Sequence, residues 1–150
     1  MDYCTDAELA RLIPERTLVE LASDDPAATL ADAVVMGEAR EFGQSQCDAR
    51  LRKRYTLPLP GVPAELKHWA LALARWWLYT RRPGGPEIPR EVSEAKADAL
   101  RALDAVRDGK MDIDLPAEDG GGGGLVEGGR IKVRAPAPTF GPALWGRYDA

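Results

Sequence analysis

The chain has 150 residues and carries 24 acidic against 20 basic side chains, a formal net charge of −4 at pH 7. That length suffices for one domain with its own core and is too short for two ordinary domains. The acidic balance argues against a protein that coats nucleic acid with its whole surface, which usually requires a basic footprint. The two cysteines form no CxxC motif or Cys/His cluster, so reduced thiols in a cytoplasmic setting are expected instead of disulfides or zinc ligation.

Two short helices are predicted at the start of the chain. Thr5 and Glu8 have the spacing of a capping box, in which the threonine hydroxyl and the glutamate carboxylate each accept a backbone N–H of the first turn. Pro14 interrupts this helix, and residues 15–22 are predicted to form a second one. A loop is expected at Ser23 to Pro26 because its residues favour turns.

A long helix is predicted from Ala27 to about Arg54. Its expected apolar positions are Leu30, Ala33, Val34, Gly37, Cys47 and Leu51. Gly37 and Gly43 each cost about 1 kcal/mol relative to alanine, so the sequence favours a kink or, more simply, close packing of another helix. Four cations crowd the last turn, where they suit the negative end of the helix, although a nucleic-acid contact stays open. They are Arg50, Arg52, Lys53 and Arg54.

The most apolar stretch, Glu65 to Arg81, is predicted to be the central helix. Its sequence, ELKHWALALARWWLYTR, places apolar residues around most of the helix circumference, so other helices must pack against it. The expected core residues are Leu66, Trp69, Leu73, Trp76 and Trp77. Pro63 suits the helix start, since proline lacks the N–H that a first turn cannot satisfy. Charged residues interrupt the stretch, so no membrane span or membrane partner is predicted.

A further helix is predicted from Pro89 to Arg107, with Gly109 as its left-handed stop. Residues 111–115 alternate apolar and acidic side chains, which indicates a short strand or an extended exit. The predicted fold is therefore mainly α, a small helical bundle around the central apolar helix. Residues 1–115 form the predicted helical domain.

Residues 116–150 are predicted to be a glycine-rich linker followed by an extended C-terminal docking arm. The run Gly120 to Gly124 has the composition of a flexible linker, and Gly128-Gly129 favours a short β-hairpin. Basic and aromatic residues beyond the linker suit contact with a partner, the alternative being an appendage without one. The predicted partner-binding residues are Arg130, Ile131, Lys132, Val133, Arg134, Phe140, Trp145 and Tyr148.

No catalytic constellation is found in the sequence. The only histidine, His68, lies on the central helix without a matching cysteine, serine or carboxylate motif, and no carboxylates follow a metal-binding loop pattern. We therefore expect no enzyme activity, no cofactor and no metal. The alternative function is a small helical DNA-binding regulator, favoured by the basic residues 50–54. The proline-rich loops on both sides of the central helix argue against it, because a helix-turn-helix motif uses a turn of three or four residues.

The order of elements resembles a known family. Tyr3-Cys4-Thr5 opens a capped helix, a long helix ends in Arg54-Tyr55-Thr56-Leu57-Pro58-Leu59, and an apolar helix precedes one that closes at Gly109-Lys110. This arrangement is similar to that of the gp36 family of Mu-like phages and prophages, small head-to-tail joining proteins. The most specific part is the RYxLPL-x-x-VP stretch at Arg54 to Pro63. The tryptophan-rich centre, Gly43 and the pentaglycine run depart from the family pattern.

The resemblance implies a structural virion protein. Proteins of this kind resemble helical head-completion adaptors, which form a ring beneath the portal and pass DNA through a central channel. The implied partners are copies of the same chain in a ring with the twelve-fold symmetry of the portal, the portal protein, a tail-side neck or tail-completion protein, and DNA bound without sequence preference. The implied location is the neck of the virion, after synthesis in the cytoplasm of the bacterial host.

Overall fold

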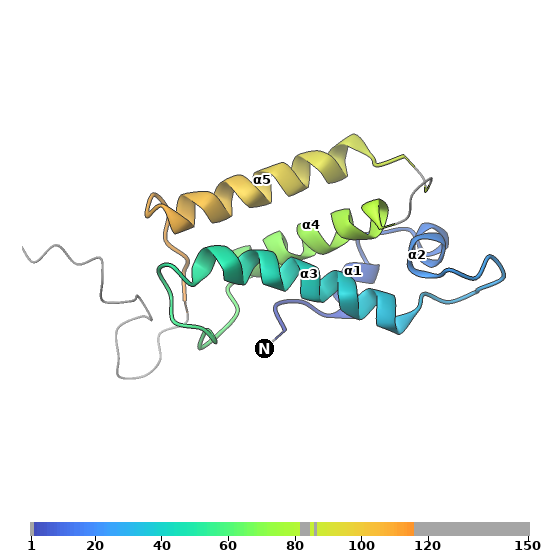
Figure 1. The fold of residues 1–150 in the computed structure, drawn as a ribbon, viewed down its shortest axis with the longest axis horizontal. Coiled ribbons are helices and arrows are strands. Elements are labelled where there is room, and N and C mark those ends of the chain that lie inside the picture. Colours follow the sequence, from blue (N-terminus) through green and yellow to red (C-terminus); the bar gives the residue numbers. More distant parts are fainter. Residues whose placement is uncertain (1, 82–84, 86, 116–150) are drawn as a thin grey trace, which may run out of the picture.

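The computed structural model describes residues 2–81, 85 and 87–115. Within these residues there are five helices and no strand: α1 (Asp6–Ala10), α2 (Glu15–Ala22), α3 (Ala33–Leu51), α4 (Ala64–Thr80) and α5 (Arg90–Arg107). Helices α3, α4 and α5 run side by side along the longest axis, and α2 lies at one end of them (Figure 1). Helix α4 contacts each of the other four helices. The predicted mainly α bundle around a central apolar helix is confirmed.

Most helix ends follow the local signals in the sequence. The Thr5 hydroxyl accepts the N–H of Glu8 at 3.3 Å, while the Glu8 carboxylate accepts the N–H of Thr5 at 2.9 Å, which is the predicted capping box. Helices α2, α4 and α5 each begin directly after a proline, at positions 14, 63 and 89. Gly109, two residues after the end of α5, has a φ of +79°. This left-handed conformation stops the helix, as predicted.

The predicted start of the long helix is wrong, because α3 begins at Ala33 and not at Ala27. The Asp32 side chain accepts the N–H of Val34 at 2.8 Å and caps α3 there. Upstream, the Asp25 carboxylate accepts the N–H of Ala27 at 2.9 Å, a local bond that competes with helix formation. The apolar positions expected in the first half of the helix are also wrong in part, because Leu30 and Val34 are 75% and 69% exposed while Val35, Met36 and Ala39 are buried.

The core surrounds α4, where Leu66 and Leu73 are buried and Trp69 is only 8% exposed. Trp76 and Trp77, also expected in the core, are only partly buried and pack at its edge. Successive side chains on a helix point about 100° apart, and Trp76 and Trp77 reach the edge of the core beside Phe42 of α3. The inward positions of this part of α4 are taken by Leu73, Ala74 and Leu78.

Helices α3 and α4 approach each other closely at Gly43. A Cβ atom placed on Gly43 would lie 2.5 Å from the carbonyl oxygen of Ala70, a distance that real Cβ atoms essentially never show. The close packing predicted from the glycine in this helix is therefore confirmed at Gly43. Gly37 has no such role, because a Cβ atom there would meet nothing within 4 Å.

The residues after α5 form an extended exit and no strand in the described range that ends at Leu115. Ile113 is 8% exposed, and its N–H donates to the Tyr55 hydroxyl at 3.1 Å in a buried hydrogen bond. The Arg54 guanidinium donates to the carbonyl oxygens of Val106 and Met111, both at 3.1 Å. Hydrogen bonds thus join the exit segment, residues 108–115, to the loop that precedes α4.

Candidate interaction surfaces

The residues predicted to contact partners lie outside the described part of the chain. They are Arg130, Ile131, Lys132, Val133, Arg134, Phe140, Trp145 and Tyr148. The described residues present other surfaces that the sequence did not predict, of which an aromatic cluster and a small pocket are the most distinctive.

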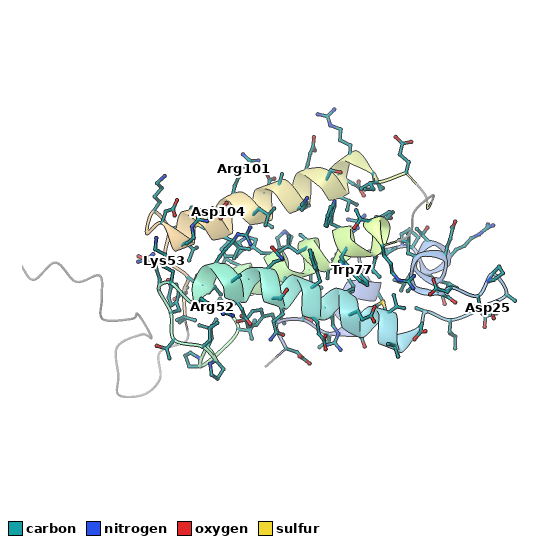
Figure 2. All side chains as sticks on the ribbon, viewed as in Figure 1. Asp25, Arg52, Lys53, Trp77, Arg101 and Asp104 are labelled. Atoms are coloured by element: carbon teal, nitrogen blue, oxygen red, sulfur yellow. The ribbon has the colours of Figure 1, made fainter. Side chains whose placement is uncertain are left out.

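The aromatic surface consists of Phe42 on α3 and of Trp76 and Trp77 on α4, all partly exposed. The Phe42 ring centroid lies 6.1 Å from that of Trp76 and 6.5 Å from that of Trp77, with tilted planes in both pairs. Trp77 therefore lies beside α3 (Figure 2). From α5, the Lys96 ammonium stands 3.7 Å above the Trp76 ring centroid, a cation–π contact. Tryptophan is enriched at protein interfaces, so partly exposed tryptophans mark this surface as a candidate contact.

One signal in the sequence could have revealed the aromatic surface. Trp76 and Trp77 are adjacent, so their side chains point about 100° apart and widen the apolar arc of this helix. Their contact with Phe42, which lies 34 and 35 positions earlier, depends on the packing of α3 on α4 and has no local signal.

The loop pocket, with a volume of about 310 Å³, lies between the N-terminal segment, α3 and the proline-rich loop. Its lining residues are Tyr3, Gln44, Asp48, Arg52, Leu57, Pro58 and Leu59. The Tyr3 hydroxyl donates a short hydrogen bond to the Asp48 carboxylate. Burial, followed by this bond and the Asp48 charge, raises the pKa of Tyr3 far above its usual value, so the phenol stays protonated. The two stretches that carry the family resemblance, around Tyr3 and Leu57, thus meet in one place.

The basic residues at the end of α3 are largely used within the fold. Arg50 pairs with Asp104 of α5 at 3.1 Å, and Arg54 pairs with Asp112 at 2.9 Å. The Arg52 guanidinium donates to the carbonyl oxygen of Asp48 at 3.3 Å. Figure 2 shows Arg52 and Lys53 at the end of the bundle where α3 ends. Arg50 and Arg54 therefore join α3 to α5 and to the exit segment. Arg52 bonds within its own helix and, like Lys53, is exposed.

In the described part of the chain both cysteines are buried and the histidine is exposed. Burial raises the pKa of Cys4 to about 11 and that of Cys47 to about 12, so both thiols are protonated at neutral pH. His68 is exposed on the surface of α4. In residues 2–81, 85 and 87–115, no group of three or more His, Cys, Asp or Glu side chains could hold a metal ion. None of the helices in those ranges is long and apolar enough to cross a membrane.

Comparison of the sequence with known protein families identifies the family of this chain. The profile of the family described as "Bacteriophage Mu, Gp36" matches residues 3–123, which is most of the chain. The chain belongs to the Mu gp36 family. It is therefore a phage or prophage protein.

Two relatives of this gp36-family chain are similar to it over most of their lengths. "Gene product J" of Escherichia phage Mu is 27% identical over 141 residues, which cover 93% of this chain and 94% of the relative. "Mu-like prophage FluMu protein gp36" of Haemophilus influenzae is 28% identical over 117 residues, covering 78% and 79% of the two chains. The aromatic surface and the loop pocket both lie within the range of the family match. The alignment with gene product J reaches beyond residue 123, because it covers 93% of this chain.

Proposed function

We propose that this gp36-family chain is a head-to-tail connector subunit. In this proposal copies of the chain form a ring between the portal and the tail, and DNA passes through the central channel. The observation that carries the proposal is the aromatic surface, because a partner that covers partly exposed tryptophans gains stability, and tryptophan is enriched among the residues that contribute most to binding. Because the chain belongs to a phage family, we expect that partner to be another protein of the phage particle.

The proposed partners follow from this role. A ring is closed by contacts between two different surfaces of neighbouring copies, and it would share the twelve-fold symmetry of the portal. The portal protein would contact one side of the ring and a tail-side neck or tail-completion protein the other. The protein would act in the neck of the virion after synthesis in the host cytoplasm, as a structural subunit and not as an enzyme.

The charges of the bundle suit DNA that slides without being held. The whole chain has a net charge of −4, and Arg50 and Arg54 are engaged with Asp104 and Asp112. A regulator that reads a DNA site would instead present such arginines to bases and phosphates. The regulator alternative is therefore less well supported than the connector, and selection of a defined site from random DNA would favour it.

A deletion of this gene in the prophage that encodes it tests the connector role. We expect the deletion to accumulate separate heads and tails in electron micrographs, and the wild-type gene supplied in trans to restore joined particles. Trp77→Ser, which alters the aromatic surface, should restore few particles, whereas the matched control His68→Ala, at an exposed position on the same helix, should restore them fully. Circular dichroism of the purified variants checks that both fold. Infectious particles assembled at normal yield by the deletion would contradict the proposal.

The C-terminal arm is tested by truncation after Leu115. The shortened chain retains every helix that the structure describes, so it should fold as a helical monomer. It should nevertheless fail to join heads to tails, since the arm is proposed to make the partner contacts. Particles that are completed normally by the truncated protein would show that the arm is dispensable.

A further inference from the structure

A groove lies at the end of the bundle where α2 meets the loop that leads to α3. Its volume is about 710 Å³. The lining includes three carboxylates, Glu15, Glu20 and Asp25, and one guanidinium, Arg16, so its formal charge is −2. Val19 and Pro26 contribute apolar area. Figure 2 shows Asp25 at the far end of the molecule. We call this feature the acidic groove.

Exposed apolar residues continue from the acidic groove along the chain. Thr29 lines the groove, and Leu30 directly follows it with 75% of its surface exposed. Val34, in the first turn of α3, is 69% exposed. Only three large hydrophobic residues are exposed in the described part of the chain, and these are two of them. The groove and its continuation therefore combine negative charge with uncovered apolar area, and they suit a ligand that is both basic and apolar.

One segment of this chain has that combination. Residues 130–134 read Arg-Ile-Lys-Val-Arg, in which three cations alternate with two β-branched apolar residues. We propose that residues 130–134 of one copy dock in the acidic groove of a neighbouring copy. This inference rests on the proposed ring, and it identifies the contact that joins one ring subunit to the next.

The length of the linker favours a neighbour over the same copy. The segment that follows α5 lies at the opposite end of the bundle from α2, whose residues line the acidic groove (Figure 1). Fourteen residues lie between Leu115 and Arg130, and a glycine-rich chain of that length has a root-mean-square span of about 19–22 Å. Helix α5 alone, with 18 residues, is about 27 Å long. The average span is thus shorter than α5, so the linker reaches a groove placed next to Leu115 with less stretching than the chain's own groove.

The same placement satisfies the geometry of a ring. A cyclic ring needs a heterologous contact, in which one surface of a subunit meets a different surface of the next. The end of the bundle that carries Leu115 supplies the basic segment, and the end that carries α2 supplies the groove. Repeating this contact from copy to copy links the subunits in one direction around the ring.

Disulfide trapping between two full-length variants tests the proposal. Thr29→Cys is placed in the groove of one variant and Val133→Cys in the basic segment of the other, and the two purified proteins are mixed under mild oxidation. Because a disulfide requires Cα atoms within about 7 Å, only docking yields a linked peptide that joins positions 29 and 133. The native Cys4 and Cys47 are buried and should contribute little background. A mixture of Glu38→Cys, at an exposed position of α3 outside the groove, with Val133→Cys is the matched control and should yield no linked peptide.

Charge reversal tests the recognition itself. Adding Lys132→Glu to the Val133→Cys variant should abolish the 29–133 link, and adding Glu15→Lys to the Thr29→Cys variant should restore it. Absence of the link in the original mixture would overturn the proposal. A link that forms only within one chain, when both cysteines are placed in the same copy, would also overturn it. Failure of the connector role is seen separately, as phage particles that are completed in the absence of this protein.

Discussion

The close contact between α3 and α4 leads to a quantitative prediction for Gly43→Ala. Alanine favours a helix interior by about 1 kcal/mol over glycine, so helix propensity alone would make the substitution stabilising. The structure predicts the opposite sign. The new Cβ would lie 2.5 Å from the carbonyl oxygen of Ala70, and restoring ordinary contact at 3.4 Å requires the two helices to separate locally by about 0.9 Å. The atom it meets belongs to the backbone of α4, so it cannot move aside as a side chain would.

Overpacking of this kind costs roughly 2–3 kcal/mol, which leaves a net loss of about 1–2 kcal/mol in the free energy of unfolding after the gain in propensity. Urea denaturation followed by circular dichroism and tryptophan fluorescence measures this quantity. Gly37→Ala is the matched control on the same helix, where a Cβ meets nothing within 4 Å, and it should raise the free energy of unfolding by up to about 1 kcal/mol. Equal stabilisation by both substitutions would refute the contact between α3 and α4 at Gly43.

Three further predictions concern individual side chains. The hydrogen bond from Lys67 holds the pKa of Glu8 at about 2, below its ordinary 4.5, so this contribution to stability is present above pH 4.5 and is lost as the pH falls towards 2. In Glu8→Gln the free energy of unfolding should therefore depend less on pH in that range, and an unchanged acid profile would contradict the assignment. Tyr55→Phe leaves the buried N–H of Ile113 without its acceptor and should cost about 1–2 kcal/mol in urea denaturation; a cost of zero would argue against the bond. The buried thiol of Cys47, with a pKa of about 12, should react with a thiol reagent only as fast as the protein opens, whereas rapid labelling of the native protein would show it exposed.

The helices were predictable where a local signal fixes their ends. The capping box at Thr5, the prolines at positions 14, 63 and 89, and Gly109 each act within one or two turns, so the sequence alone carries them. The start of α3 was not predictable in this way. The apolar pattern upstream of Ala33 resembles a helix, but local bonds of Asp25 and Asp32 select a loop.

The interaction surfaces were less predictable because they join distant parts of the chain. Phe42 meets the adjacent tryptophans Trp76 and Trp77 only when α3 packs on α4. Apolar periodicity indicates that a tryptophan belongs near the core, but it does not distinguish a buried ring from one at the edge. The Tyr3–Asp48 bond similarly joins residues 45 positions apart. The sequence did supply the family, since the stretches that carry the resemblance lie within the matched residues 3–123.

Locating the protein in intact phage particles tests the central claim most directly. Cryo-electron microscopy of purified virions, with mass spectrometry to identify their proteins, would place this chain in or outside the neck. We predict a ring of helical density between the portal and the tail, into which copies of the α3–α4–α5 bundle fit. Complete particles that lack this protein would contradict the proposed connector function.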